Sequence, residues 1–160
     1  MQKHIDIHIS SCCSSNPGVG GYGLKLIYAQ HQKTIAGGYR YTTNGRIALH
    51  GVIVALQAIT ESCQIAVHTP VDYLVKAFNQ DWVSKWVEND WYKADGEPVK
   101  NQDLWRHLLK LIDKHEQVTF TLLDKNSQAG QDMAQLAQNA IAEFDLPADL
   151  VYEQQARVAL

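Results

Sequence analysis

The most informative stretch of the chain is HIDIHISSCCSSNPGVGGYG, residues 4–23. Residues 4–9 alternate strictly between polar and apolar side chains, which is the period of a β-strand with one buried face. The proline and glycines after residue 16 favour a turn, because glycine adopts backbone angles that other residues avoid. We therefore expect an N-terminal strand followed by a turn, with these polar side chains on one face: His4, Asp6, His8 and Ser10.

Beyond this stretch the hydrophobic pattern switches repeatedly between the strand and helix periods. Further strands are expected at about 22–30, 34–42, 63–68 and 118–123. Helical spacing is expected at about 44–60, 70–79, 101–114 and 131–143. This order predicts an α/β domain over residues 1–145, with a mixed sheet flanked by helices. Residues 146–160 are expected to form a weakly structured C-terminal tail.

Composition and charge narrow the class of protein. Of the 160 residues, 46% are hydrophobic and 19% are charged, as in a folded globular domain. No apolar run approaches the roughly 18 residues of a membrane span, and the polar start predicts no signal peptide. The net charge of −3 excludes a surface that binds nucleic acid by charge alone. Three cysteines, an odd number, favour the reducing cytoplasm over a disulfide framework.

Five separated motifs follow one another between about residues 4 and 142. They are the turn NPGVGGYG at 16–23, GGY at 37–39, TTNGR at 42–46, the tryptophans Trp82, Trp86 and Trp91, and the run ADGEPVKNQDLW at 94–105. Together they resemble the ribonuclease H type 1 family, in particular its bacterial members. The resemblance implies a ribonuclease H-like fold, with a five-stranded mixed sheet, antiparallel among its first three strands, and helices on both faces.

The resemblance also implies cleavage of the RNA strand of RNA–DNA hybrids by two Mg²⁺ or Mn²⁺ ions held by four carboxylates. Aligned on the motifs, those four positions are substituted in this chain and hold Ser10, Ala48, Pro70 and Ala134. The family's mobile histidine falls near Lys125 or Asn126, and neither residue replaces it. Divalent ions of this kind need oxygen ligands. We therefore expect no catalytic residue of the family type and no bound Mg²⁺ or Mn²⁺.

Polar residues that match the family's hybrid-binding surface are retained. By motif, the candidates for nucleic-acid binding are Asn16, Thr43, Asn44 and Asn101. Such groups can read the 2′-hydroxyl that distinguishes RNA from DNA. The alternative is structural, because asparagine is common in turns and threonine is common at helix starts.

The segment 81–100 resembles the basic handle of the family but carries the opposite charge. It holds three lysines and five acidic residues, a net of −2, so hybrid binding is expected to be weak. The tryptophans of this region and Trp105 could stack on bases. At helical spacing, however, they are expected to pack in the core.

Two histidines offer a separate metal hypothesis. His8 and His68 end strands that are neighbours in the expected fold, each two residues before a substituted carboxylate position. A two-histidine site completed by cysteine or water would suit Zn²⁺ or Ni²⁺. The alternative is a pair of solvated or hydrogen-bonded histidines, because two ligands do not define a metal site.

Taken together, the sequence favours a catalytically inactive ribonuclease H homologue, a pseudo-enzyme with at most weak hybrid binding. One alternative is an interaction scaffold on the same fold, with an unidentified protein partner. A second is an active metal-dependent hybrid endoribonuclease with displaced ligands. A hybrid-binding titration at low salt and a cleavage assay with Mg²⁺ and Mn²⁺ separate the three.

Overall fold

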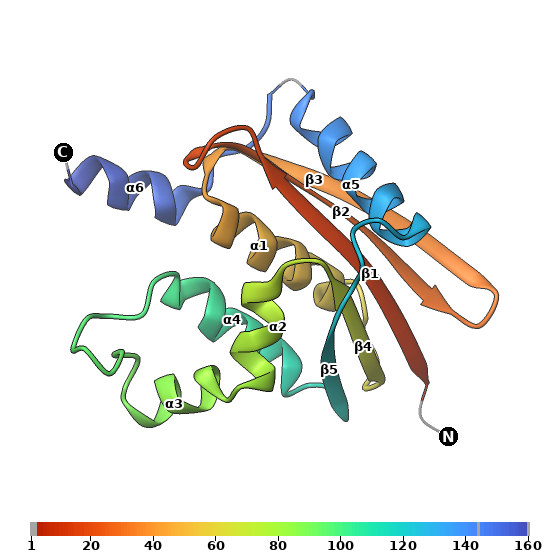
Figure 1. Cartoon of the computed structure of the whole chain (residues 1–160), viewed down its shortest axis with the longest axis horizontal. Coiled ribbons are helices and arrows are strands. Elements are labelled where there is room, and N and C mark those ends of the chain that lie inside the picture. The colour runs from red at the N-terminus through yellow and green to blue at the C-terminus, as the bar shows by residue number, and fades with distance from the viewer. Residues whose placement is uncertain (1–2, 144, 160) are drawn as a thin grey trace.

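The computed structural model describes residues 3–143 and 145–159. Its elements are β1 (His4–Cys13), β2 (Gly18–Tyr28), β3 (His31–Thr42), α1 (Asn44–Gln57), β4 (Gln64–Thr69), α2 (Asp72–Asn79), α3 (Trp82–Glu88), α4 (Gln102–Ile112), β5 (Gln117–Leu122), α5 (Gln128–Ile141) and α6 (Leu150–Ala159). The strands form one sheet in the order β3-β2-β1-β4-β5 (Figure 1). The first three strands are antiparallel, and β4 and β5 continue the sheet in parallel. The expected ribonuclease H-like fold is confirmed.

Helices cover the sheet on both faces. α1 packs on β1 and β2 from one side and carries α4 on its outer surface, while α5 crosses β1, β2 and β3 on the opposite face (Figure 1). None of the described helices is long and apolar enough to cross a membrane. The sheet end at the start of α1 is thus framed by elements from both faces.

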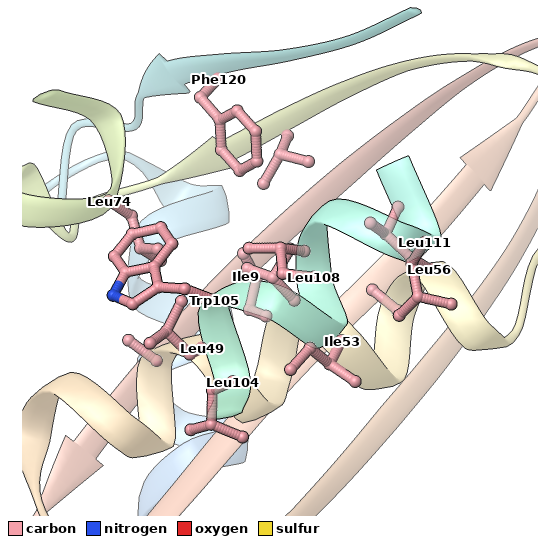
Figure 2. Packing of buried hydrophobic residues seen from close by; sticks show 14 of the residues in the cluster. Ile9, Leu49, Ile53, Leu56, Leu74, Leu104, Trp105, Leu108, Leu111 and Phe120 are labelled. Carbon is pink, nitrogen blue, oxygen red and sulfur yellow. The ribbon is translucent and has the colours of Figure 1, made fainter. Parts of the chain in front are cut away.

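The main core lies between α1, α4 and the sheet. Trp105 is fully buried among leucine and isoleucine side chains, and Figure 2 shows it beside Leu49 and Leu74. Trp91 is also buried, and Trp82 and Trp86 pack against the same cluster. The expectation that the tryptophans form core is therefore confirmed.

Glycines of the turn motif at 16–23 let α5 lie close to the sheet. A Cβ on Gly23 would clash with the side chain of Leu136, and one on Gly21 would lie 2.6 Å from the Ala137 carbonyl oxygen. Because no side chain stands between them, β2 and α5 approach closely. This approach holds α5, which carries Ala134, against the strand next to Ser10.

Two elements differ from the sequence expectation. The helix expected from residue 70 begins at Asp72, since Thr69 is the buried last residue of β4 and Pro70 lies in the connection. The tail from 146, expected to be weakly structured, contains the helix α6. The tail is anchored by Asp149, whose buried carboxylate accepts a hydrogen bond from Thr42 Oγ1 at 2.7 Å. Neither partner is visible to a local pattern, because they lie far apart in the sequence.

Candidate nucleic-acid interface and the substituted metal site

A groove opens at the N-terminal end of α1 and has a volume of about 1030 Å³. It runs between the β1–β2 turn, the start of α1, the start of α4 and one side of α6. All four predicted nucleic-acid-binding residues line it: Asn16, Thr43, Asn44 and Asn101. Tyr73, Lys100 and Tyr152 also line it. The structure therefore brings the four predicted residues together from three separate segments of the chain, and the tyrosines add two more segments.

Two of these residues also hold the local backbone. Asn16 Oδ1 accepts a hydrogen bond from the backbone N–H of Asn44 at 3.1 Å, which ties the β1–β2 turn to α1. Thr43 caps α1, and its Oγ1 accepts from the backbone N–H of Arg46 at 3.2 Å. Asn16 therefore has the structural role expected of a turn asparagine, and Thr43 that of a helix-capping threonine. Because the Asn16 hydrogen bond uses only Oδ1, the amide N–H₂ group of Asn16 has no hydrogen-bond partner among the described residues.

The side chains of Asn44 and Asn101 do less to hold the local backbone than those of Asn16 and Thr43. Asn44 is exposed, and its side chain makes no hydrogen bond to any described residue. Asn101 has a left-handed backbone conformation with φ of 64° at the start of α4, and its side chain is 3.5 Å from Arg46 Nη1. The unpaired amide groups at the rim are suited to donate to a ligand oxygen and to accept from a hydroxyl.

A buried charge cluster lies beneath the groove. Arg46 is 1% exposed and donates to Asp103 through Nη1 and Nη2 at 2.8 and 2.7 Å. Its Nε donates to Asp149 Oδ2 at 2.8 Å, and His50 Nε2 lies 3.2 Å from the same oxygen. Two carboxylates therefore neutralise the guanidinium, which stabilises the groove floor and adds no free positive charge to it.

The protonation of this cluster follows from its contacts. Burial alone would raise the pKa of Asp149, but the neighbouring His50 and the hydrogen bonds from Arg46 and Thr42 outweigh it and hold that pKa well below its usual range. The sequence places Arg46 in a motif but reveals neither its role nor that of Asp149. The other partner of Arg46 is Asp103, in the first turn of α4. An aspartate at the start of a helix is too common for the sequence alone to identify it as that partner.

The motif alignment predicts the family's carboxylate positions at Ser10, Ala48, Pro70 and Ala134, and the structure locates each of these residues as follows. β1 and β4 are parallel with His8 opposite His68, so Ser10 and Pro70 lie two residues further along neighbouring chain segments. Ala48 faces the core from α1. Ala134 lies on α5, which packs on β1 and β2.

These side chains do not fit a pair of divalent ions. Alanine and proline offer no side-chain ligand atom, and Ser10 offers one hydroxyl that is buried. Within residues 3–143 and 145–159, no group of three or more His, Cys, Asp or Glu side chains is arranged to hold a metal ion. No step of a mechanism is therefore assigned to Mg²⁺ or Mn²⁺ at this position.

The two histidines of the metal hypothesis do lie together. His8 and His68 have ring centroids 5.4 Å apart in an edge-to-face arrangement. His68 Nε2 is 2.9 Å from Asp6 Oδ1, and His4 Nε2 is 3.5 Å from the same oxygen. Among residues 3–143 and 145–159, no third His, Cys, Asp or Glu side chain joins the two histidines in an arrangement that could hold a metal ion.

Comparison with known proteins identifies the family. A model of the RNase H family matches residues 2–140. The chain belongs to the ribonuclease H family. A Ribonuclease H of Rippkaea orientalis is 40% identical over 153 residues, which cover 94% of this chain and 93% of the relative. A Ribonuclease H of Chlorobaculum parvum is 39% identical over 145 residues, or 89% of this chain and 99% of the relative.

Solved structures of ribonuclease H proteins share the fold. LC9-RNase H1, a type 1 RNase H with the type 2 active-site motif, superposes with a TM-score of 0.78 at 22% identity, covering 89% of this chain and 74% of its own. LC11-RNase H1, solved in complex with an RNA/DNA hybrid, gives a TM-score of 0.66 at 16% identity, covering 86% and 96%. At these identities the similarity establishes the ribonuclease H fold.

The relatives also correct the functional prediction. Chains about 40% identical over most of this ribonuclease H sequence carry the name Ribonuclease H, so the prediction of a catalytically inactive homologue is wrong. Of the alternatives drawn from the sequence, an active ribonuclease H is the one that the relatives support. The error lay in equating the loss of four metal ligands with the loss of activity. Phosphodiester cleavage has other routes, including general acid–base catalysis without a metal ion.

Proposed function

We propose that this protein binds RNA/DNA hybrids along the groove at the N-terminal end of α1. The observation that carries the proposal is the convergence of the four motif-matched polar residues on that groove: Asn16, Thr43, Asn44 and Asn101. At about 1030 Å³, the groove is at the upper end of the range for small-molecule pockets and suits a longer ligand. LC11-RNase H1, which shares the fold, was solved in complex with such a hybrid.

The chemistry of the groove suits a sugar–phosphate backbone that carries 2′-hydroxyl groups. Neutral amides and hydroxyls can donate to and accept from the 2′-hydroxyl, which DNA lacks. Tyr73 and Tyr152 also line the groove and offer aromatic surfaces for riboses or bases. Lys100 is the one lysine of the lining and makes no ion pair with a described residue. Affinity therefore rests on hydrogen bonds and contacts more than on charge.

A second candidate function is cleavage of the RNA strand of such hybrids. The relatives named Ribonuclease H, at about 40% identity over most of the chain, support it. The residues at the substituted metal site do not supply the ligands for this reaction. The cleaving groups must then lie elsewhere on the surface near the bound hybrid.

The state of the cysteines is relevant to the cellular compartment in which the protein works. Cys12, Cys13 and Cys63 are all free thiols. Free thiols persist where the compartment is reducing, and we propose the cytoplasm on that ground.

Fluorescence anisotropy with a labelled RNA/DNA hybrid tests the binding proposal, with a DNA duplex of the same sequence as competitor. Asn44→Ala is the sharpest variant, because its side chain has no described hydrogen bond and alanine favours the helix. Loss of one neutral hydrogen bond of about 0.5–1.5 kcal/mol should raise Kd roughly two- to tenfold. Asn139→Ala, on the exposed side of α5, is the matched control and should leave Kd unchanged.

Two results would contradict the proposal. One is a failure of the unaltered protein to bind the hybrid at low salt. The other is binding that Asn44→Ala and Asn16→Ala both leave unchanged. Equal affinity for the DNA duplex would show that the groove does not read the 2′-hydroxyl.

A further inference from the structure

The C-terminal helix α6 forms one wall of the groove. Tyr152 and Gln155 of this helix line the groove together with residues of the β1–β2 turn, α1 and the start of α4. Figure 1 shows α6 beside the start of α1. The family model ends its match at residue 140, whereas α6 covers Leu150–Ala159. One wall of the groove therefore lies outside the segment that the family model matches.

Two sets of contacts fix α6 in this place. Asp149, directly before the helix, accepts hydrogen bonds from Thr42 Oγ1 at 2.7 Å and from Arg46 Nε at 2.8 Å. On α6 itself, the carboxylate of Glu153 accepts from Arg40 Nε at 3.0 Å and from Arg40 Nη2 at 2.9 Å. The helix is thus attached both to α1 and to β3, and the residues between these contacts have a defined position.

Two tyrosine rings are held by packing at the wall of the groove. The guanidinium carbon of Arg46 lies 5.9 Å from the ring centroid of Tyr152, and the ring centroid of Tyr41 lies 5.6 Å from it. Tyr73, on α2, also lines the groove, and its ring centroid lies 5.7 Å from that of Trp105. Aromatic side chains held in this way are suited to stack on unpaired bases.

The composition of the groove favours an unpaired strand over a duplex. A duplex is bound mainly through its phosphates, by several lysine and arginine side chains. Among the described lining residues Lys100 is the one lysine, and the charge of Arg46 is neutralised by Asp103 and Asp149. An unpaired base, by contrast, offers a free face for stacking and a free edge for hydrogen bonds. The Asn44 amide, which bonds no described residue, can donate to and accept from such an edge.

We propose that the groove binds an unpaired stretch of RNA that continues from one end of a hybrid, with a base stacked on Tyr152. The inference rests on the proposed function, because it concerns the same groove and the same nucleic acid. Such a stretch occurs wherever an RNA strand extends beyond the DNA with which it pairs. The amides of Asn44 and Asn101 hydrogen-bond to the unpaired nucleotides, and Lys100 neutralises one phosphate. Helix α6 is then the element that distinguishes such an end from a blunt hybrid.

The test compares two labelled ligands by fluorescence anisotropy. One is a blunt RNA/DNA hybrid, and the other is the same hybrid with an RNA overhang of about four nucleotides. We expect the overhang to lower Kd about five- to 150-fold, the usual effect of one base stacked on an aromatic side chain. Tyr152→Leu keeps an apolar side chain but removes the aromatic ring, so it should abolish this gain, whereas Tyr152→Phe should retain it.

A matched control and a fluorescent base separate stacking from a structural role of Tyr152. Tyr28→Leu changes an exposed tyrosine at the end of β2, outside the groove lining, and should leave the gain unchanged. 2-Aminopurine in the overhang loses emission when it stacks on an aromatic ring. The saturated complex should therefore be dimmer with the unaltered protein than with Tyr152→Leu. Circular dichroism and thermal unfolding show whether each variant is folded.

The two hybrids also distinguish failure of this inference from failure of the groove proposal. An overhang that leaves Kd unchanged, or a gain that Tyr152→Leu retains, would overturn the stacking site, while binding of the blunt hybrid would leave the groove proposal standing. An equal gain from a DNA overhang would overturn the assignment to RNA. Absence of binding to both hybrids would instead refute the groove proposal.

Discussion

The groove at the start of α1 and the sheet end at Ser10 and Pro70 adjoin each other but differ in what they keep of the ribonuclease H pattern. The groove is lined by all four motif-matched polar residues, whereas the motif alignment predicts no carboxylate at the four positions of the sheet end. Both regions nevertheless have the backbone of the family, because the fold depends on the glycine turn, the strand register and the core. The comparison teaches that a few side chains carry the metal chemistry and can change without altering the frame.

The two regions also differ in how charge is arranged. Beneath the groove, Arg46 is paired with Asp103 and Asp149 in a buried cluster. The sheet end holds neutral side chains at the positions where the family places carboxylates. Carboxylates gathered without a counter-ion repel one another, so neutral side chains favour this end of the sheet when no metal is present. Paired charges therefore stabilise the floor of the groove, whereas neutral side chains stabilise the folded sheet end in the absence of metal.

The largest expected effect comes from breaking the cluster beneath the groove. Arg46→Ala leaves the carboxylates of Asp103 and Asp149 without their main partner, and Asp149 is only 3% exposed. Breaking a buried ion pair from one side should lower the free energy of unfolding by about 3–5 kcal/mol. Urea denaturation followed by circular dichroism measures the change.

Arg40→Ala is the control for this loss. Arg40 pairs with Glu153 through its exposed side chain and lies outside the buried cluster. We expect its removal to leave the unfolding midpoint nearly unchanged, because exposed ion pairs contribute little. Equal destabilisation by the two variants would show that burial of the pair does not matter.

The same cluster marks the limit of what the sequence predicts. The alternation at residues 4–9 and the motif at 16–23 predict the first strand, the turn and the family fold, because they depend on local periods and backbone angles. The motif match also predicts the groove residues. Asp149 could not be found in this way, since its partner Arg46 lies 103 residues away. Nor does any local pattern show that Asp6 orients His68 across the sheet.

The second prediction converts the sheet end to the family pattern. A variant with Ser10→Asp, Ala48→Glu, Pro70→Asp and Ala134→Asp should bind Mg²⁺, because it supplies four oxygen ligands around one site. Mg²⁺ at about 100 times its Kd would stabilise this variant by about 2.7 kcal/mol. Thermal unfolding with and without MgCl₂ measures the effect. An equal shift in the unaltered protein, or no shift in the variant, would contradict the placement of the four positions around one site.

The third prediction concerns the pH dependence of stability. Asp149 has a folded-state pKa below the ordinary value of 3.8, so between these values the unfolded state binds more protons than the folded state. Its stabilising contribution is complete above about pH 5 and is lost as the pH falls toward the folded pKa, with a slope of at most about 1.4 kcal/mol per pH unit. Asp149→Asn should therefore flatten the decline in unfolding free energy between about pH 5 and 3. Parallel curves for the variant and the unaltered protein would show that Asp149 does not titrate in this way.

The smallest expected effect separates the neutral and charged contributions within the groove. Each lysine or arginine that neutralises a phosphate steepens the plot of log affinity against log salt by about 0.9. Lys100 is the lysine of the groove lining, so the slope for the hybrid should be about −1. Lys100→Ala should flatten that slope by about 1, whereas Asn44→Ala should lower affinity at every salt concentration and leave the slope unchanged. Anisotropy titrations from about 25 to about 200 mM salt give both quantities. A slope of about −4 or steeper would mean that several lysine or arginine side chains outside the groove bind the phosphate backbone, despite the acidic segment 81–100. The neutral groove residues would then contribute less to affinity than those charges.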